Sequence, residues 1–130
     1  MPRVRDEQVR RYARHILLPD VGGLGQTALM VSSARLELRE SEPDAELIAA
    51  TYLAAGGVGT VVIRGASPSQ VAGLVAHGPD TKLASMGDGQ EVLMQPRPPW
   101  WPSTEGDAAA LAFWRGGVAA TRWMSEVANR

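Results

Sequence analysis

Residues 34–64, ARLELRESEPDAELIAATYLAAGGVGTVVIR, decide the fold of this chain. Leu36 and Leu38 alternate with charged residues, which is typical of a half-buried strand. Five residues then recur at helical spacing: Leu47, Ile48, Thr51, Tyr52 and Ala55. Glycines in the segment 56–59 end this predicted helix, because glycine tolerates positive φ. Residues 61–63 are apolar and β-branched, as in a buried parallel strand. The stretch therefore predicts a βαβ unit.

The connection between the predicted strand and helix, residues 41–46, reads SEPDAE. A βαβ unit that binds a nucleotide usually carries a glycine-rich loop here, so that main-chain amides can approach the phosphates. In this chain Glu42, Asp44 and Glu46 would turn carboxylates toward such a ligand. The connection therefore predicts that no nucleotide binds.

The whole chain of 130 residues is predicted to form one α/β domain, a truncated Rossmann-like parallel sheet flanked by helices. Within the N-terminal helical arm, residues 1–33, we expect a helix over 3–18, a loop over 21–25 and a short helix over 26–33. A βαβα core over 34–77 follows, and its last helix starts at Ser67-Pro68 and ends near His77. A Pro/Trp-containing connection spans residues 78–104. Within it we expect an irregular stretch over 78–90 and a strand over 91–95. A helix over 105–128 follows.

Composition excludes several classes of function. Thirteen basic residues balance 14 acidic ones, so no nucleic-acid-binding surface is indicated. The absence of cysteine excludes a cysteine nucleophile, a thiolate metal site and a disulfide scaffold. No apolar run reaches the roughly 20 residues that span a bilayer, and the charged N-terminus does not resemble a secretory signal. We therefore expect a cytoplasmic protein with no membrane contact.

Two segments leave alternatives open. In the proline-rich run around Trp100 and Trp101, the tryptophans either pin a loop to the core or offer an aromatic contact to a partner. In the C-terminal helix, small residues such as Gly116 and Ala120 allow another backbone to come close. That backbone belongs either to the same chain or to a second subunit.

With these elements in place, the chain resembles the E1-like adenylating family that includes ThiF, MoeB and HesA. Residues 11–18, RYARHILL, are similar to the family's opening RYxRQ helix, and Gly25-Gln26 to the turn that follows it. Residues 52–59, YLAAGGVG, resemble the family's YLAxAGVG segment. A weaker match covers residues 116–123. The resemblance implies a Rossmann-type core related to the first part of that family's fold.

The chain departs from the family at the residues that carry its chemistry. The family's GxGxxG loop falls on residues 41–46, and its acidic pair falls on Gly65 and Ser67. The zinc cysteines and the catalytic cysteine have no counterpart. Only Arg14 matches a functional residue, an arginine that in the family reaches the partner subunit's nucleotide site. The resemblance thus implies a relative that is no enzyme, with no catalytic residue, no cofactor and no metal.

What such a relative retains is the family's capacity to dimerise and to hold a peptide or a protein tail. Our main hypothesis is a peptide-binding protein that presents a ribosomal precursor peptide to partner enzymes in natural-product biosynthesis of the crocagin type. An edge strand would accept the extended peptide. Candidate contact residues are Arg14, Arg97, Trp100 and Trp101.

Two further hypotheses remain. One is a pseudo-E1 subunit that pairs with an active adenylating enzyme through Arg14, and the other is a small enzyme that uses His15 or His77. A pull-down would separate the pseudo-E1 hypothesis from the main one. The pseudo-E1 hypothesis predicts that an adenylating enzyme is recovered, whereas the main hypothesis predicts a peptide. We also expect a homodimer, built from the N-terminal helix and the small-residue face of the last helix.

Overall fold

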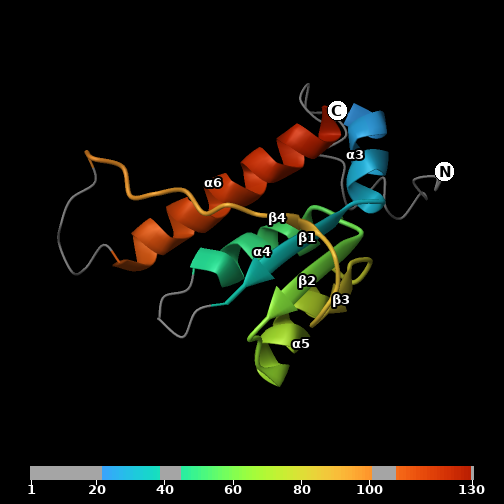
Figure 1. The fold of residues 1–130 in the computed structure, drawn as a ribbon, viewed down its shortest axis with the longest axis horizontal. Helices are drawn as coiled ribbons and strands as arrows, with labels where there is room; N and C mark the ends of the chain where they lie inside the picture. Colours follow the sequence, from blue (N-terminus) through green and yellow to red (C-terminus); the bar gives the residue numbers. More distant parts are fainter. Residues whose placement is uncertain (1–21, 39–44, 101–107, 130) are drawn as a thin grey trace.

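The computed structural model describes residues 22–38, 45–100 and 108–129. Four parallel strands form one sheet in the order β3-β2-β1-β4, with helices packed against it (Figure 1). The elements are α3 (Gly22–Met30), β1 (Ser33–Glu37), α4 (Ala45–Ala55), β2 (Thr60–Arg64), α5 (Pro68–His77), β3 (Lys82–Ala84), β4 (Gln90–Glu91) and α6 (Ala108–Ala128). This order matches the first four strands of the Rossmann order 3-2-1-4-5-6. The predicted α/β class, with a parallel sheet flanked by helices, is confirmed.

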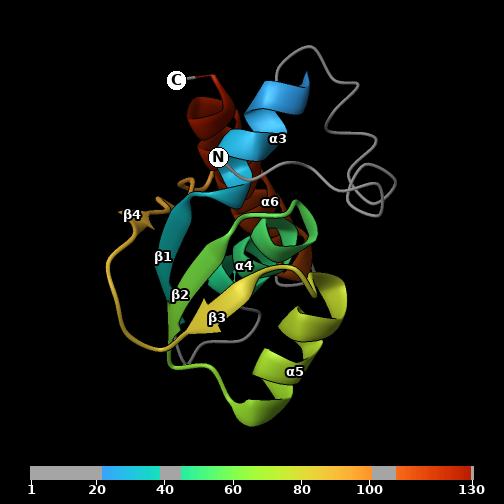
Figure 2. The same ribbon diagram turned by 90° about the vertical axis from the view of Figure 1, so that its right-hand side faces the viewer.

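The helices lie on one face of the sheet. Helix α4 contacts β1 and β2 of the sheet, and α6 packs beside it on the same side of the sheet (Figure 2). On the opposite face, the connection from β3 to β4 crosses the sheet, with Gly87 against Val62 and Gly89 against Ala34. Arg35 and Glu37 are exposed on that face. The alternation of apolar and charged residues along β1 therefore matches a sheet with one buried and one polar face.

The predicted βαβ unit is present as β1, α4 and β2. Gly57 has a positive φ of 83° just after α4, as expected for a glycine that ends a helix. Val61, Val62 and Ile63 are all buried, as predicted for an inner parallel strand. The sequence also predicts that Ser41, with Asp44 three residues on, caps the start of this helix, but both residues lie outside the described residues.

The face that α4 buries differs from the apolar stripe predicted from the sequence. Of that stripe, Tyr52 and Ala55 are exposed and the other three are half-buried. The buried side instead carries small and acidic residues along with one leucine: Ala45, Glu46, Ala49, Ala50, Leu53 and Ala54. Alanine is favoured on this side because α4 packs against both the sheet and α6, and the short side chain of alanine lets both approach closely.

Helix α6 begins at Ala108, three residues after the predicted start, and ends at Ala128 as predicted. Gly116, Ala119, Ala120 and Trp123 are buried. A Cβ built on Gly116 would collide with the carbonyl oxygen of Ala45 in α4. These small residues therefore serve close packing within the chain. Within the described ranges, no helix is both long enough and apolar enough to cross a membrane.

The loop predicted over residues 21–25 was wrong, since α3 begins at Gly22. Three glycines disfavour a helix here by about 1 kcal/mol each. Packing compensates for that cost, because Gln26 and Leu29 are fully buried and α3 contacts α6. The side chain of Gln26 also donates a 2.9 Å hydrogen bond to the carbonyl of Gly56.

Two strand predictions also need correction. The segment 78–90, predicted to be irregular, contains β3, a three-residue edge strand whose sequence KLA holds no β-branched residue to signal it. The strand predicted over 91–95 is shorter, because β4 comprises only Gln90–Glu91. The chain turns away from β1 after Val92, whose amide donates to the carbonyl of Arg35 at 3.1 Å.

Helix α5 confirms its predicted boundaries. Ser67 is its N-cap, with a complete capping box to Gln70, and Pro68 occupies the first turn. The predicted helix over 3–18 lies outside the described residues. The sequence also predicts a capping box of Thr104 and Asp107 at the start of the last helix, and these residues lie outside the described residues as well.

Candidate functional site

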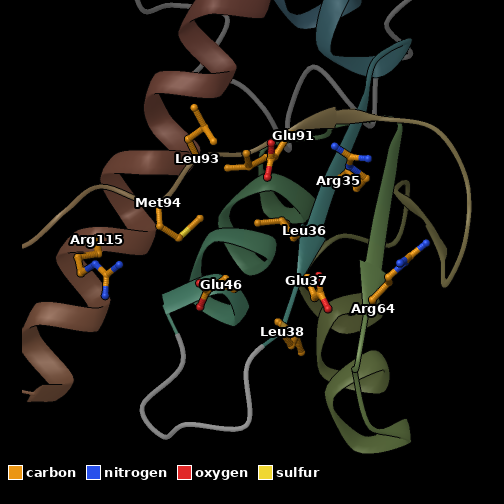
Figure 3. Close-up of a pocket in the computed structure, with 11 residues that line it drawn as sticks. Arg35, Leu36, Glu37, Leu38, Glu46, Arg64, Glu91, Leu93, Met94 and Arg115 are labelled. Carbon is orange, nitrogen blue, oxygen red and sulfur yellow. The ribbon is translucent and has the colours of Figure 1, made fainter.

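A cavity of about 850 Å³ lies at the C-terminal end of β1 (Figure 3). Its lining residues come from β1, α4, β2, α6 and the segment that starts in β4: Arg35, Leu36, Glu37, Leu38, Glu46, Arg64, Glu91, Val92, Leu93, Met94 and Arg115. We refer to this space as the β1-end cavity. It combines five apolar side chains with three arginines and three glutamates.

The position of the cavity follows from the sheet topology. The chain leaves β1 to form β2 on one side, and β4 joins β1 on the other side, so the direction of strand succession reverses at β1. In open parallel sheets, ligands bind at such a switch point, outside the carboxyl ends of the strands. The β1-end cavity occupies that place.

The far wall of the cavity is held away from β1 by two arginines of α6. Arg115 donates from Nε to the carbonyl oxygen of Gln95 at 2.6 Å. Arg122 donates from Nη1 to Oε1 of the same Gln95 at 3.0 Å. Gln95 is thus fixed to α6 through both its main chain and its side chain. This attachment draws residues 93–95 toward α6 and leaves the end of β1 uncovered on that side.

The main chain of Glu37 faces the β1-end cavity. Leu38 donates its N–H to Arg64 of β2 at 2.9 Å. Since the peptide bond is planar and trans, the carbonyl of Glu37 points away from β2, toward the side on which β4 lies. The N–H of Glu37 faces the same way, because both groups of a residue in a parallel ladder point to one neighbour. Among the described residues, no hydrogen bond joins this main chain to the segment after β4.

The charged side chains around the cavity are balanced and separate. Within the described part of the chain, Arg35, Glu37, Arg64 and Glu91 form no ion pair with one another. All four are exposed. Their charges are therefore accessible to a ligand.

At the inner wall, Glu46 is 8% exposed and lies in the first turn of α4. A carboxylate at this place interacts favourably with the positive end of the helix dipole. The helix terminus that would face a phosphate in a nucleotide-binding βαβ unit is therefore next to a carboxylate.

No metal centre is visible in the part of the chain that the structure describes: no group of three His, Asp or Glu residues could hold an ion. His77 is exposed in the last turn of α5, away from the residues that line the cavity.

The two site residues predicted from sequence that the structure describes lie elsewhere. Arg97 and Trp100 are exposed on the segment that follows Gln95, and neither lines the β1-end cavity. Trp100 is 71% exposed and makes an edge-to-face contact with Trp114 of α6 at a ring distance of 6.4 Å. Arg14 and Trp101 lie outside the described residues.

Sequence reasoning missed the residues that line the cavity. A signal was available in the alternating sequence of β1, where Arg35 and Glu37 frame Leu36. The end of the first strand of a βαβ unit is also the usual ligand position. Arg115 gave no such signal, because only the fold brings α6 to the end of β1.

A scan of the sequence against models of known protein families finds no match, and a search of the curated proteins finds none either.

Proposed function

We propose that this protein binds an extended peptide or protein tail at the β1-end cavity and performs no chemistry on it. The observation that carries the proposal is the main chain of Glu37, whose N–H and C=O face the cavity beyond the point where β4 stops pairing. An extended peptide placed there would add a short strand beside β1. Main-chain hydrogen bonds of this kind give affinity, while neighbouring side-chain pockets give specificity.

The composition of the cavity supports a peptide over a nucleotide. Three glutamates offset three arginines, so the lining has no excess of positive charge for a polyphosphate. Glu46 lies in the α4 turn where phosphates bind in nucleotide-binding units. A peptide, with its neutral main chain and mixed side chains, suits such a lining better.

The resemblance to the E1-like family extends the proposal to the identity of the peptide and its use in the cell. If the chain is a truncated, non-catalytic relative, the peptide is a ribosomal precursor that the protein presents to partner enzymes in natural-product biosynthesis. The switch-point position of the cavity supports this extension, because it is the place where a Rossmann-type core binds its ligand.

The experiment uses random heptapeptides displayed on phage and the purified full chain as bait. Selected peptides are then synthesised and titrated by calorimetry against the wild type and two variants. Glu37→Pro removes the amide donor that faces the cavity, and Glu37→Ala retains it. We expect Glu37→Pro to weaken binding at least tenfold, consistent with loss of a hydrogen bond worth about 1 kcal/mol and of local strand geometry. Glu37→Ala should change affinity by less than threefold.

Thermal unfolding controls for the fold. Proline is tolerated at an edge position whose N–H is unpaired, so Glu37→Pro should remain folded. Leu38→Pro is the matched contrast, because it removes the amide that bonds Arg64 and should lower the melting temperature. Selection of no peptide, or equal affinity of wild type and Glu37→Pro, would refute the proposal.

A further inference from the structure

We infer that the bound peptide presents a lysine or arginine beside an apolar residue, with the basic residue opposite Glu37 and the apolar residue opposite Leu38. The inference rests on the proposed function, since it assumes that a peptide strand occupies the β1-end cavity. It follows from three features: the register of the sheet, the charges around the unpaired position opposite Glu37, and the apolar inner wall of the cavity. We refer to that unpaired position as the vacant position.

The register defines where a peptide strand would place its side chains. Ala34 pairs with Gln90 and Arg35 pairs with Glu91 along β1 and β4. A peptide that continues the line of β4 sets one residue opposite Glu37. Residues paired directly across two strands point to the same face, so this side chain lies on the polar face of the sheet together with Glu37.

Two carboxylates flank that position. Glu37 is its cross-strand neighbour, and Glu91 lies two places back along the line of β4, on the same face. Arg64 pairs with Glu37 from β2, so β1 lies between its strand and the vacant position (Figure 3). Arg35 pairs with Glu91 and lies two residues before Glu37 on β1, diagonally across from the vacant position. A cationic side chain therefore meets the carboxylates first, whereas an acidic one is repelled by both.

The place opposite Leu36 is taken by Val92, whose amide donates to the carbonyl of Arg35. The peptide residue opposite Leu38 would point to the inner face, where it meets Leu38 and Leu36 of β1, with Met94 on the opposite wall. Leu36 and Val92 are 4% and 5% exposed, so this wall is continuous with the core. Apolar side chains gain most from such a surface. The preferred segment is therefore a basic residue with an apolar residue next to it.

The heptapeptides selected in the phage experiment test this pattern directly. We expect them to share a lysine or arginine with an apolar residue next to it. Replacing that basic residue by glutamate should weaken binding to the wild type about fivefold to tenfold, as expected for exposed charge pairs. The double variant Glu37→Gln, Glu91→Gln should bind the basic and the acidic peptide within twofold of each other. Glu126→Gln, an exposed change on α6, should leave the preference unchanged.

The amide resonance of Glu37 in a ¹⁵N-labelled sample distinguishes failure of this inference from failure of the proposed function. If the selected peptides shift this resonance but show no preference for a basic residue, the inference is overturned while the proposed function stands. If no selected peptide shifts it, the cavity is not the binding site and both are overturned. A preference that survives the double variant would also overturn the inference.

Discussion

The two edges of β1 behave differently. On one edge, five residues pair with β2, and the carbonyl of Arg64 still accepts a bond from Leu38 beyond the last pair. On the other edge, β4 pairs with only two residues before the chain is drawn toward α6. The first edge builds the core. The second leaves main-chain groups facing a cavity, so the candidate site arises where pairing stops rather than where a special motif occurs.

This contrast extends to the helices. The layer that covers β1 and β2 is closely packed, since Gly116 of α6 leaves no room for a Cβ beside Ala45 of α4. At the end of β1, side chains of both charges surround open space. Stability and binding should therefore respond to different residues, and substitutions on the two sides can separate them.

The largest effect on stability is expected from Gly116→Ala. The added methyl group would collide with the main chain of Ala45, which cannot rotate away, so α4 and α6 would have to separate. We expect a loss of about 3 kcal/mol in the free energy of unfolding, measured by urea denaturation.

Gly117→Ala is the matched control for this prediction. A Cβ at Gly117 would lie 3.6 Å from a ring carbon of Tyr52, which is ordinary contact. Because alanine favours a helix, this variant should be as stable as the wild type or up to about 1 kcal/mol more stable. Equal destabilisation by both variants would mean that the contact between α4 and α6 is not as close as described.

A smaller effect is expected where pairing with β1 ends. Val92 is 5% exposed and Leu93 is 69% exposed, although they are neighbours. Val92→Ala removes two buried carbon atoms and should cost about 2 kcal/mol. Leu93→Ala should change stability by less than about 0.5 kcal/mol. Chemical denaturation of the two variants measures the difference, and a reversed order would place the end of the paired edge elsewhere.

Much of the fold could be predicted from the sequence because the relevant signals are local. Alternation marked β1, a β-branched run marked β2, and Ser67-Pro68 marked the start of α5. Two segments that carried the family resemblance also meet in space, since Gln26 donates to Gly56. That contact links α3 to the residue after the end of α4 and does not depend on any motif for catalysis.

The rest depends on tertiary contacts that no local pattern records. Helix α3 begins in a glycine-rich segment because Gln26 and Leu29 are buried. Strand β4 ends early because Arg115 and Arg122 hold Gln95 on α6. Both arginines lie 20 or more residues further along the chain, so no local pattern indicates the contact. The candidate site lies at that junction. The exposed tryptophan segment was easier to notice but lies outside the cavity lining.

A modest stability effect is expected at Trp100, one of the two predicted contact residues that the structure describes. Its ring is 71% exposed and meets Trp114 edge-to-face, a contact worth about 1 kcal/mol or less at such an exposed site. Trp100→Ala should therefore lower the melting temperature by only a few degrees. Trp114→Ala, at a half-buried position of α6, should lower it more.

Binding decides what Trp100 contributes. If the peptide extends from the β1-end cavity along the segment after Gln95, the exposed ring is a second contact, and Trp100→Ala should weaken a selected peptide severalfold, less than Glu37→Pro does. Extending the synthetic peptide by four residues at either end should enlarge this difference, because each extension increases the reach beyond the cavity. Unchanged affinity for all of these peptides would confine recognition to the paired edge of β1. A large fall in melting temperature with unchanged affinity would instead make Trp100 a structural anchor for its segment.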